Sequence, residues 1–367
     1  MNRIEKLIQE LCPNGVPFYP LSAVATVKTG DVITKKKIQE SPGSFPVINS
    51  GKQPLGYVSD FNAEDEPLGV ASRGSVGWVS WFPGKIFRGS LNYGVVPDKN
   101  KVDERFLYFV MKSKDAEIQQ LSTHEGIPAL NKSNLVKFQV PVPPIEVQRE
   151  IVKILDLFTE LEAELEAELE ARRKQYEHYR DQLLTFPENG GATWTPMGDV
   201  VRLRNGKDYK HLGAGTVPVY GSGGVLAYVD EPAYVGKTVL VPRKGSISSV
   251  YFVDGPVWTV DTCFYSEIDE TRLHPRFLYH YLIREDLGRL NTAGGVPSLT
   301  QKVLNRLKLA LPSLAEQTRI ADVLDKFDAL VNDLSSGLPA EIEARRKQYE
   351  YYRDKLLTFK ELQPEAA

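Results

Sequence analysis

The chain has 367 residues, of which 42% are hydrophobic and 25% charged, so it is long enough for two folded domains and is neither disordered nor collagen-like. Its two cysteines lie far apart and match no metal-ligand spacing, and no apolar run reaches the ~18 residues of a membrane span. The N-terminal MNRIEKLIQE has no signal-peptide core. These features predict a reduced, cytoplasmic protein with no membrane role.

The net charge of −3 is unevenly distributed along the chain. Residues 1–144 contain 17 basic and 14 acidic residues, and residues 187–315 contain 14 and 12. Residues 145–186 contain 6 basic and 11 acidic residues, and residues 316–367 contain 8 and 11. Two mildly basic segments therefore alternate with two acidic ones, and this asymmetry says more about partners than the average does.

The clearest feature of the sequence is an internal repeat. EARRKQYEHYRDQLLTF at 170–186 recurs as EARRKQYEYYRDKLLTF at 343–359, identical at 15 of 17 positions. The similarity extends upstream, where residues 126–158 align with residues 295–327 at an offset of 169 instead of 173, and fainter echoes run through the remainder. The repeat predicts a globular block and a helix, followed by a second block and a second helix.

In chain order, residues 1–144 form the first block, with short strands and a helical stretch near 104–121. Pro143-Pro144 precedes a long helix at 145–186, and a second block follows at 187–315, with a helical stretch near 275–290. A second long helix at 316–360 begins with capping-box spacing between Ser313 and Glu316, and Gly337 and Pro339 predict a kink or break in it. Residues 361–367 are a C-terminal tail.

Both long helices carry an apolar stripe at alternating steps of three and four residues, which is the pattern of a coiled coil. We expect them to pack antiparallel, either only to hold the protein together or also to offer their flanks to partners. The predicted seam contains Phe158, Leu161, Leu165, Tyr176 and Tyr179 of the first helix and Phe327, Leu330, Leu334, Tyr349 and Tyr352 of the second.

The sequence contains no recognisable catalytic constellation. It has no Gly-rich phosphate loop, and its five histidines show no metal-ligand spacing. Its only Pro-Pro pair lacks the polar and aromatic neighbours with which DNA aminomethyltransferases hold a flipped base. Asp208-Tyr209-Lys210 supplies half of a nuclease motif, but in a Gly-rich loop. We therefore predict a non-enzymatic chain with no catalytic residue, no metal site and no cofactor of its own.

Basic and polar residues in the loops of both blocks favour DNA binding, because Arg and Asn read base edges while Lys contacts phosphates. Each one alone could equally be a solvated surface residue. Arg73-Gly74-Ser75 and Lys244-Gly245-Ser246 repeat between the blocks, either as DNA contacts or as a shared tight turn. The predicted DNA-binding residues are Lys28, Lys35, Lys36, Lys37, Ser50, Lys52, Arg73, Ser75 and Arg88 in the first block, and Arg204, Asn205, Lys207, Lys210, Ser222, Arg243, Lys244 and Ser246 in the second.

The plan of the chain resembles the specificity subunit of type I restriction-modification systems. The resemblance spans essentially the whole sequence and is carried by LPSLAEQTRI at 311–320 and by the two near-identical helix endings. The first copy departs from it, with Val147 where the pattern has Glu. The resemblance implies a mixed α/β (α+β) fold, with two pseudo-symmetric globular target-recognition domains separated by two long antiparallel coiled-coil helices.

For function, the resemblance implies that each domain reads one half of a bipartite double-stranded DNA target. The helices would set the spacer and dock two modification subunits, which carry S-adenosylmethionine and methylate adenine at N6. Restriction subunits would add translocation and cleavage that depend on ATP and Mg. Two alternatives are a coiled-coil scaffold without a DNA role and a methyltransferase–nuclease fusion.

Overall fold

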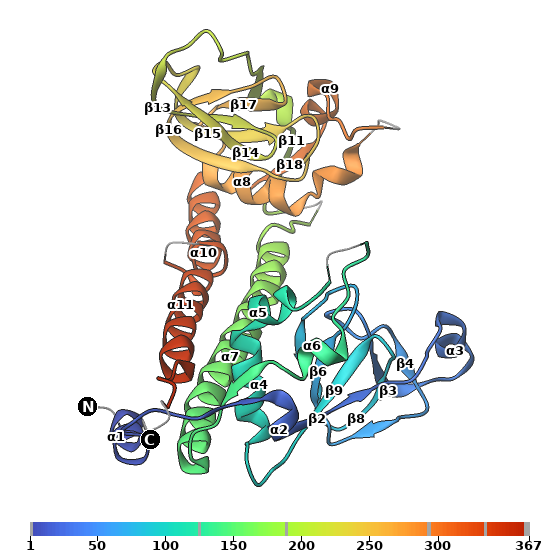
Figure 1. Ribbon diagram of the computed structural model, residues 1–367. Helices are drawn as coiled ribbons and strands as arrows, with labels where there is room; N and C mark the ends of the chain where they lie inside the picture. Colours follow the sequence, from blue (N-terminus) through green and yellow to red (C-terminus); the bar gives the residue numbers. More distant parts are fainter. Residues whose placement is uncertain (1–2, 124–125, 188–189, 292–294, 334–335, 363–367) are drawn as a thin grey trace. The chain divides into compact units, whose positions relative to one another are not determined.

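The computed structural model describes residues 3–123, 126–187, 190–291, 295–333 and 336–362 (Figure 1). The chain forms two compact units, Met1–Glu164 with Glu343–Ala367, and Leu165–Ile342. Each unit combines one globular block with helical segments from both copies of the repeat. None of the described helices is both long and apolar enough to cross a membrane.

The globular block of the first unit contains two four-stranded sheets, ordered β2-β9-β6-β7 and β4-β3-β8-β5, and a separate β1-β10 pair. Strands β3 and β8 are parallel, with Val47 opposite Phe87. Its elements are α1 (Arg3–Leu11), β1 (Phe18–Pro20), α2 (Leu21–Val24), β2 (Ala25–Thr29), α3 (Lys35–Glu40), β3 (Pro42–Ile48), β4 (Tyr57–Val58), β5 (Ala63–Glu64), β6 (Leu68–Ala71), β7 (Val79–Trp81), β8 (Lys85–Arg88), β9 (Asn92–Pro97), α4 (Glu104–Ser113), α5 (Asp115–Gln120), α6 (Lys132–Leu135) and β10 (Gln139–Pro141).

The block of the second unit contains a six-stranded sheet, ordered β12-β17-β15-β16-β13-β14, and a β11-β18 pair. Strands β13 and β16 are parallel, with Val219 opposite Trp258, so the repeat extends to strand pairing. Its elements are β11 (Thr193–Pro196), η1 (Met197–Asp199), β12 (Val201–Asn205), β13 (Ala214–Gly221), β14 (Gly224–Val229), β15 (Tyr234–Pro242), β16 (Tyr251–Thr259), β17 (Cys263–Ile268), α8 (Pro275–Arg284), η2 (Leu287–Leu290), α9 (Gln301–Asn305) and β18 (Lys308–Leu311).

The predicted long helices are present, and the second is interrupted as expected. The first is α7 (Ile145–Leu183), and the second is divided into α10 (Leu314–Asn332) and α11 (Leu338–Leu357). The Ser313 side chain accepts a hydrogen bond from the Glu316 N–H and so caps α10. Gly337 lies at the break, where a Cβ atom would come within 2.5 Å of the Ala329 carbonyl oxygen.

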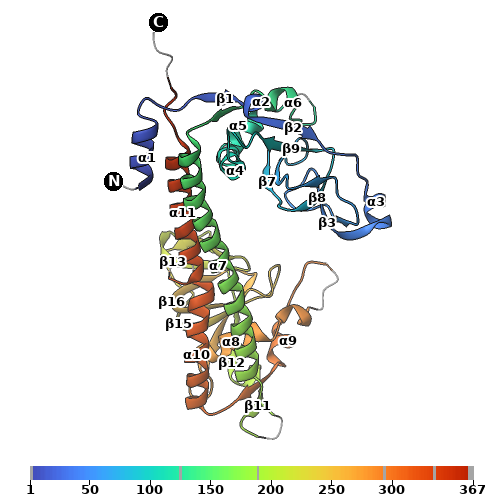
Figure 2. The same cartoon turned by 90° about the horizontal axis from the view of Figure 1, so that it is seen from below.

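Antiparallel packing of the helices is confirmed inside each unit (Figure 2). In the first unit, Phe158 of α7 stacks on Tyr352 of α11 with ring centroids 5.6 Å apart, and Glu162 binds Arg346 at 2.5 Å. In the second unit, Tyr179 of α7 stacks on Phe327 of α10 at 5.5 Å. In each stack, the C-terminal part of the long helix of one repeat contacts the N-terminal part of the long helix of the other repeat. Each unit is therefore completed by the helix ending of the other repeat.

The predicted seam residues differ in how far this packing buries them. Tyr176 is buried, and Phe158, Leu165, Phe327, Tyr349 and Tyr352 are partly buried. Leu161, Tyr179 and Leu330 are each more than a third exposed. Leu334 lies outside the described residues.

A buried glutamine joins each long helix to its globular block. Gln148 accepts a hydrogen bond from the Asp103 N–H at 2.7 Å and donates to the carbonyls of Lys101 and Pro143. Gln317 repeats this arrangement with the His274 N–H at 2.8 Å and the carbonyls of Arg272 and Pro312. Both side chains are fully buried, so these bonds satisfy backbone groups that water does not reach.

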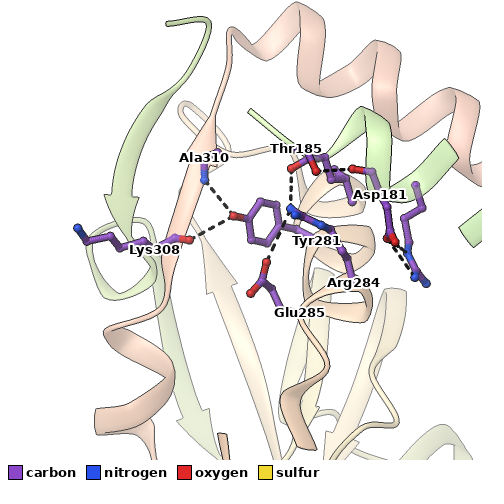
Figure 3. Close-up of polar contacts among 9 residues, drawn as sticks. Asp181, Thr185, Tyr281, Arg284, Glu285, Lys308 and Ala310 are labelled. Carbon is purple, nitrogen blue, oxygen red and sulfur yellow. Dashed lines mark hydrogen bonds and ion pairs between the residues drawn. The ribbon is translucent and has the colours of Figure 1, made fainter. Parts of the chain in front are cut away.

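Further polar contacts fix the end of α7 against the second block (Figure 3). Arg284 of α8 donates to the Leu184 carbonyl at 2.7 Å. The Tyr281 hydroxyl donates to the Lys308 carbonyl and accepts from the Ala310 N–H, which ties α8 to β18 (Figure 3). The long helix and the block therefore form one body within this unit.

Replacing Gln317 with leucine should destabilise the second unit by about 2–4 kcal/mol, because the substitution leaves the His274 N–H and two carbonyls buried without partners. Chemical denaturation of the purified chain measures this change. Thr318→Ala is the matched control, since Thr318 is the exposed neighbour on the same helix. Equal stability of the two variants would contradict the role given to the glutamine.

Candidate nucleic-acid interface

In each block the structure brings the basic-Gly-Ser turn against a second turn, called here the Ser-Gly turn, which is Ser50-Gly51 in the first block and Ser222-Gly223 in the second. In the first block the Ser75 N–H donates to the Ser50 carbonyl at 2.9 Å. In the second, a Cβ atom at Gly245 would lie 3.2 Å from the Ser222 hydroxyl oxygen. Gly74 and Gly245 have φ angles of +71° and +78°, a region that favours glycine. The repeated glycine is therefore required by the turn, and the turn holds its basic residue at the surface.

The basic residues at these turns lack neutralising partners. Arg73 and Lys244 are exposed, and neither side chain makes a hydrogen bond or ion pair within the described ranges. Arg243 is partly buried with its guanidinium 5.2 Å from the Phe264 ring, and its Nε is buried without a partner. These uncompensated positive charges suit an anionic ligand such as a DNA backbone.

Lys52 extends this surface in the first block. Its ammonium group lies 4.4 Å from the centre of the Trp78 ring, and both residues line a cavity of about 390 Å³ next to Gly74 and Ser75. The hydroxyl-bearing residues of the two turns are also accessible: Ser50, Ser75 and Ser222 are partly exposed, and Ser246 is exposed. The turns thus present both cationic and hydrogen-bonding groups.

Each block has a second basic segment, and in both blocks this segment packs over a small apolar cluster at an equivalent place in the fold. In the first block, α3 carries Lys35, Lys36 and Lys37, and its Ile38 packs on Val47, Val58 and Phe87. In the second block, the loop at 207–212 packs through Tyr209 and Leu212 on Val217, Val219, Val229 and Trp258. Lys207 and Lys210 are exposed on this loop. One segment is a helix and the other a loop, so sequence alignment of the blocks does not reveal their correspondence.

Other predicted contacts have partners within the protein. Lys28 on β2 pairs with Glu66 at 2.5 Å, and Arg204 on β12 pairs with Glu267 at 3.0 Å. The hydrogen bond with Glu267 raises the pKa of Arg204. Asn205 accepts a hydrogen bond from Gln301 at 3.3 Å and, with Arg204 and Lys207, lines a polar cavity of about 650 Å³. The carboxylates neutralise much of the charge of these two cations.

The prediction that Arg88 contacts DNA is wrong. Arg88 is only 3% exposed and donates hydrogen bonds to Asn92 Oδ1 at 2.6 Å and to the Glu66 carbonyl. Burial lowers its pKa to about 10. Its guanidinium occupies the space above Gly69 and Gly94, where Cβ atoms would approach it to 2.6 and 2.8 Å. Arg88 is a structural residue that ties β8 to the neighbouring sheet.

Sequence reasoning also missed a surface feature next to the turns. An exposed leucine and tyrosine follow the Ser-Gly turn in both blocks, Leu55 with Tyr57 and Leu226 with Tyr228. Apolar residues in short strands are normally taken as core, and only their exposure in the structure distinguishes these four. No group of three or more potential metal-ligating side chains occurs in the part of the chain that the structure describes.

Comparison with known proteins agrees with this architecture. Residues 13–171 and 193–344 each match the type I restriction modification DNA specificity domain. A putative type I restriction enzyme specificity subunit from Haemophilus influenzae is 31% identical over 97% of this chain and 98% of its own length. A type I restriction enzyme specificity subunit from Escherichia coli is 30% identical over 98% of this chain and 97% of its own.

Solved structures show the same fold. A type I restriction-modification S subunit from M. genitalium has a TM-score of 0.69 at 20% identity, covering 94% of this chain and 96% of that one. The two matches to the family model show that the protein is built from two DNA specificity domains of the type I restriction-modification class. The chain belongs to the family of type I restriction-modification specificity subunits.

Replacing Arg73 or Lys244 with alanine should weaken DNA binding by the assembled complex without unfolding the chain, because both side chains are exposed and unpaired. If the replaced side chain contacts a phosphate, the variant should lose affinity for all sequences, and the slope of log affinity against log salt concentration should decrease in magnitude by about one. A base contact should cost about 1–3 kcal/mol at one position only. Fluorescence anisotropy at two salt concentrations separates these cases.

Lys28→Ala is the matched control for these variants, because Lys28 is a surface lysine already paired with Glu66. Its effect on DNA affinity should be smaller than that of either turn variant. Wild-type binding by both turn variants would show that the turns serve the fold alone.

Proposed function

We propose that each globular block of this DNA sequence-recognition subunit of a type I restriction-modification complex reads one half of a bipartite double-stranded DNA target. The observation that supports this most directly is the occurrence of the same turn arrangement once in each unit, with Arg73 at one turn and Lys244 at the other. Equivalent scaffolds with different exposed side chains suit two readers of different sequences.

The helices would set the distance between the readers and dock two modification subunits. Both helix endings expose the same residue types at equivalent positions: Arg173, Lys174 and Glu177 on α7, and Arg346, Lys347 and Glu350 on α11. Packing between the helices uses Arg346, which pairs with Glu162 of α7, but it does not account for the identity of Lys174 with Lys347 or of Glu177 with Glu350. Two matching exposed surfaces fit two copies of one partner, in addition to their role in joining the helices.

The catalytic steps would belong to the partner subunits. In this proposal the modification subunits bring S-adenosylmethionine for adenine N6 methylation, and restriction subunits bring the ATP- and Mg-dependent steps of translocation and cleavage. This chain would contribute recognition and no catalytic group. The coiled-coil scaffold alternative does not account for uncompensated cations at matching turns in both blocks. The fusion alternative does not account for two specificity domains that occupy most of the chain.

Exchanging residues 187–315 for the corresponding block of a relative with a different target should change one half-site and leave the other unchanged. The exchange should keep Arg276 and Arg284, because Arg276 pairs with Asp325 of α10 and Arg284 donates to the Leu184 carbonyl at the end of α7, and both partners lie outside the exchanged block. Methylome sequencing of cells carrying the complete system reads out both half-sites. A change in both half-sites, or in neither, would contradict the proposal.

A further inference from the structure

An exposed apolar pair follows the Ser-Gly turn in each block. The exposed fractions are 44% for Leu55 and 54% for Tyr57 in the first block, and 56% for Leu226 and 59% for Tyr228 in the second. Both tyrosines lie on strands at the edge of a sheet, β4 and β14. Exposed apolar side chains on an edge strand favour aggregation. Their occurrence at equivalent places in two diverged blocks therefore indicates a binding role.

In the second block the pair adjoins the hairpin turn of the candidate interface. Gly221 pairs with Gly224, so Ser222 lies in the connection between β13 and β14. The Leu226 side chain lies against Gly221, and a Cβ atom added to Gly221 would come within 2.8 Å of it. The Tyr251 hydroxyl donates to the Ser222 carbonyl at 3.2 Å. The apolar pair and the cationic turn Lys244-Gly245-Ser246 thus flank the same Ser-Gly turn.

In the first block the arrangement is the same. The Leu55 N–H donates to the Val47 carbonyl at 2.8 Å, which fixes the strand that follows the turn. Ser50, which binds the Arg73-Gly74-Ser75 turn, and Lys52 lie in the connection that leads to Leu55. Each block therefore places a leucine and a tyrosine beside a Ser-Gly turn and at least one cation without a carboxylate partner.

This combination fits the major groove of DNA better than a protein surface. The uncompensated cations complement phosphates, and the hydroxyl groups of the turn can bind base edges. An apolar side chain in the major groove has one distinctive partner, the C5-methyl group of thymine. We propose that Leu55 with Tyr57, and Leu226 with Tyr228, detect thymine methyl groups, one pair for each half-site. This inference rests on the proposed function, in which each block reads one half-site.

The test uses the assembled complex and its target duplex, with the half-sites taken from methylome sequencing. Deoxyuridine replaces the thymines of one half-site, which removes only the methyl groups. For the wild-type complex, each contacted methyl lost should weaken binding roughly fourfold, as expected for about 0.8 kcal/mol of apolar contact. The double variant Leu55→Ala, Tyr57→Ala should bind thymine and deoxyuridine duplexes equally in the first half-site.

The double variant Leu226→Ala, Tyr228→Ala is the matched control. It should remain sensitive to deoxyuridine in the first half-site and become insensitive in the second. Thermal unfolding of both variants should stay close to wild type, because the replaced side chains are largely exposed.

Two results would overturn the inference. One is a wild-type complex that ignores deoxyuridine in both half-sites. The other is a variant that keeps methyl sensitivity but loses the modification subunits, which would make the pair a protein-docking surface. If one pair governed both half-sites, the proposed function itself would fail. If the wild-type complex is insensitive to deoxyuridine but the block exchange still changes one half-site, only the methyl contact is rejected and the proposed function stands.

Discussion

A long helix with one apolar stripe gains stability only when that stripe is covered, and in this chain the cover comes from the other copy of the repeat. Phe158 of the first copy stacks on Tyr352 of the second, and Phe327 of the second stacks on Tyr179 of the first. Leu356 and Leu357, at the end of α11, belong to the core of the first unit. Neither unit is complete without residues from both halves of the sequence.

An ion pair also joins each long helix to the globular block of its own repeat. Arg105 binds Asp156 at 2.7 Å in the first unit, and Arg276 binds Asp325 at 2.7 Å in the second. His280 is an addition in the second unit, where it joins Asp325 at 2.6 Å to the Tyr176 hydroxyl at 3.2 Å. Burial alone would raise the pKa of Asp325, but its hydrogen bonds with His280 and Arg276 lower it overall. The helix of the first repeat is thereby held to the second block through a buried polar network.

The residues that hold the helices and blocks together are different from the exposed residues that are proposed to contact DNA. The stacks lie between the long helices, the buried glutamines and the paired carboxylates lie where the helices meet the blocks, and all of them recur in both units. The turns that display Arg73 and Lys244 use a glycine in the left-handed region, while the side chains of these two basic residues make no hydrogen bond or ion pair with any residue that the structure describes. Exposed side chains can therefore change without disturbing the helices, as recognition of different DNA sequences requires.

The sequence predicted those parts of the fold that depend on local pattern or on near-identity of the repeats. The apolar stripe specified the antiparallel helices, and Gly337 with Pro339 specified the break between α10 and α11. The burial of Arg88 could not be predicted, because it depends on Gly69 and Gly94 from two other strands. The two basic segments over the apolar clusters, and the exposure of Tyr57 and Tyr228, likewise follow from packing between distant segments.

The central proposal is that the paired helices set the distance between the two half-sites that the units read. It is tested most directly by inserting four residues at both unit boundaries, between Glu164 and Leu165 and between Ile342 and Glu343. Four residues lengthen a helix by about 6 Å and keep its stripe nearly in phase, and the rise of B-DNA is about 3.4 Å per base pair. The methylome of cells carrying this variant should show a spacer longer by about one to two base pairs, with both half-sites unchanged. An active complex with the original spacer, or with an altered half-site, would contradict the account.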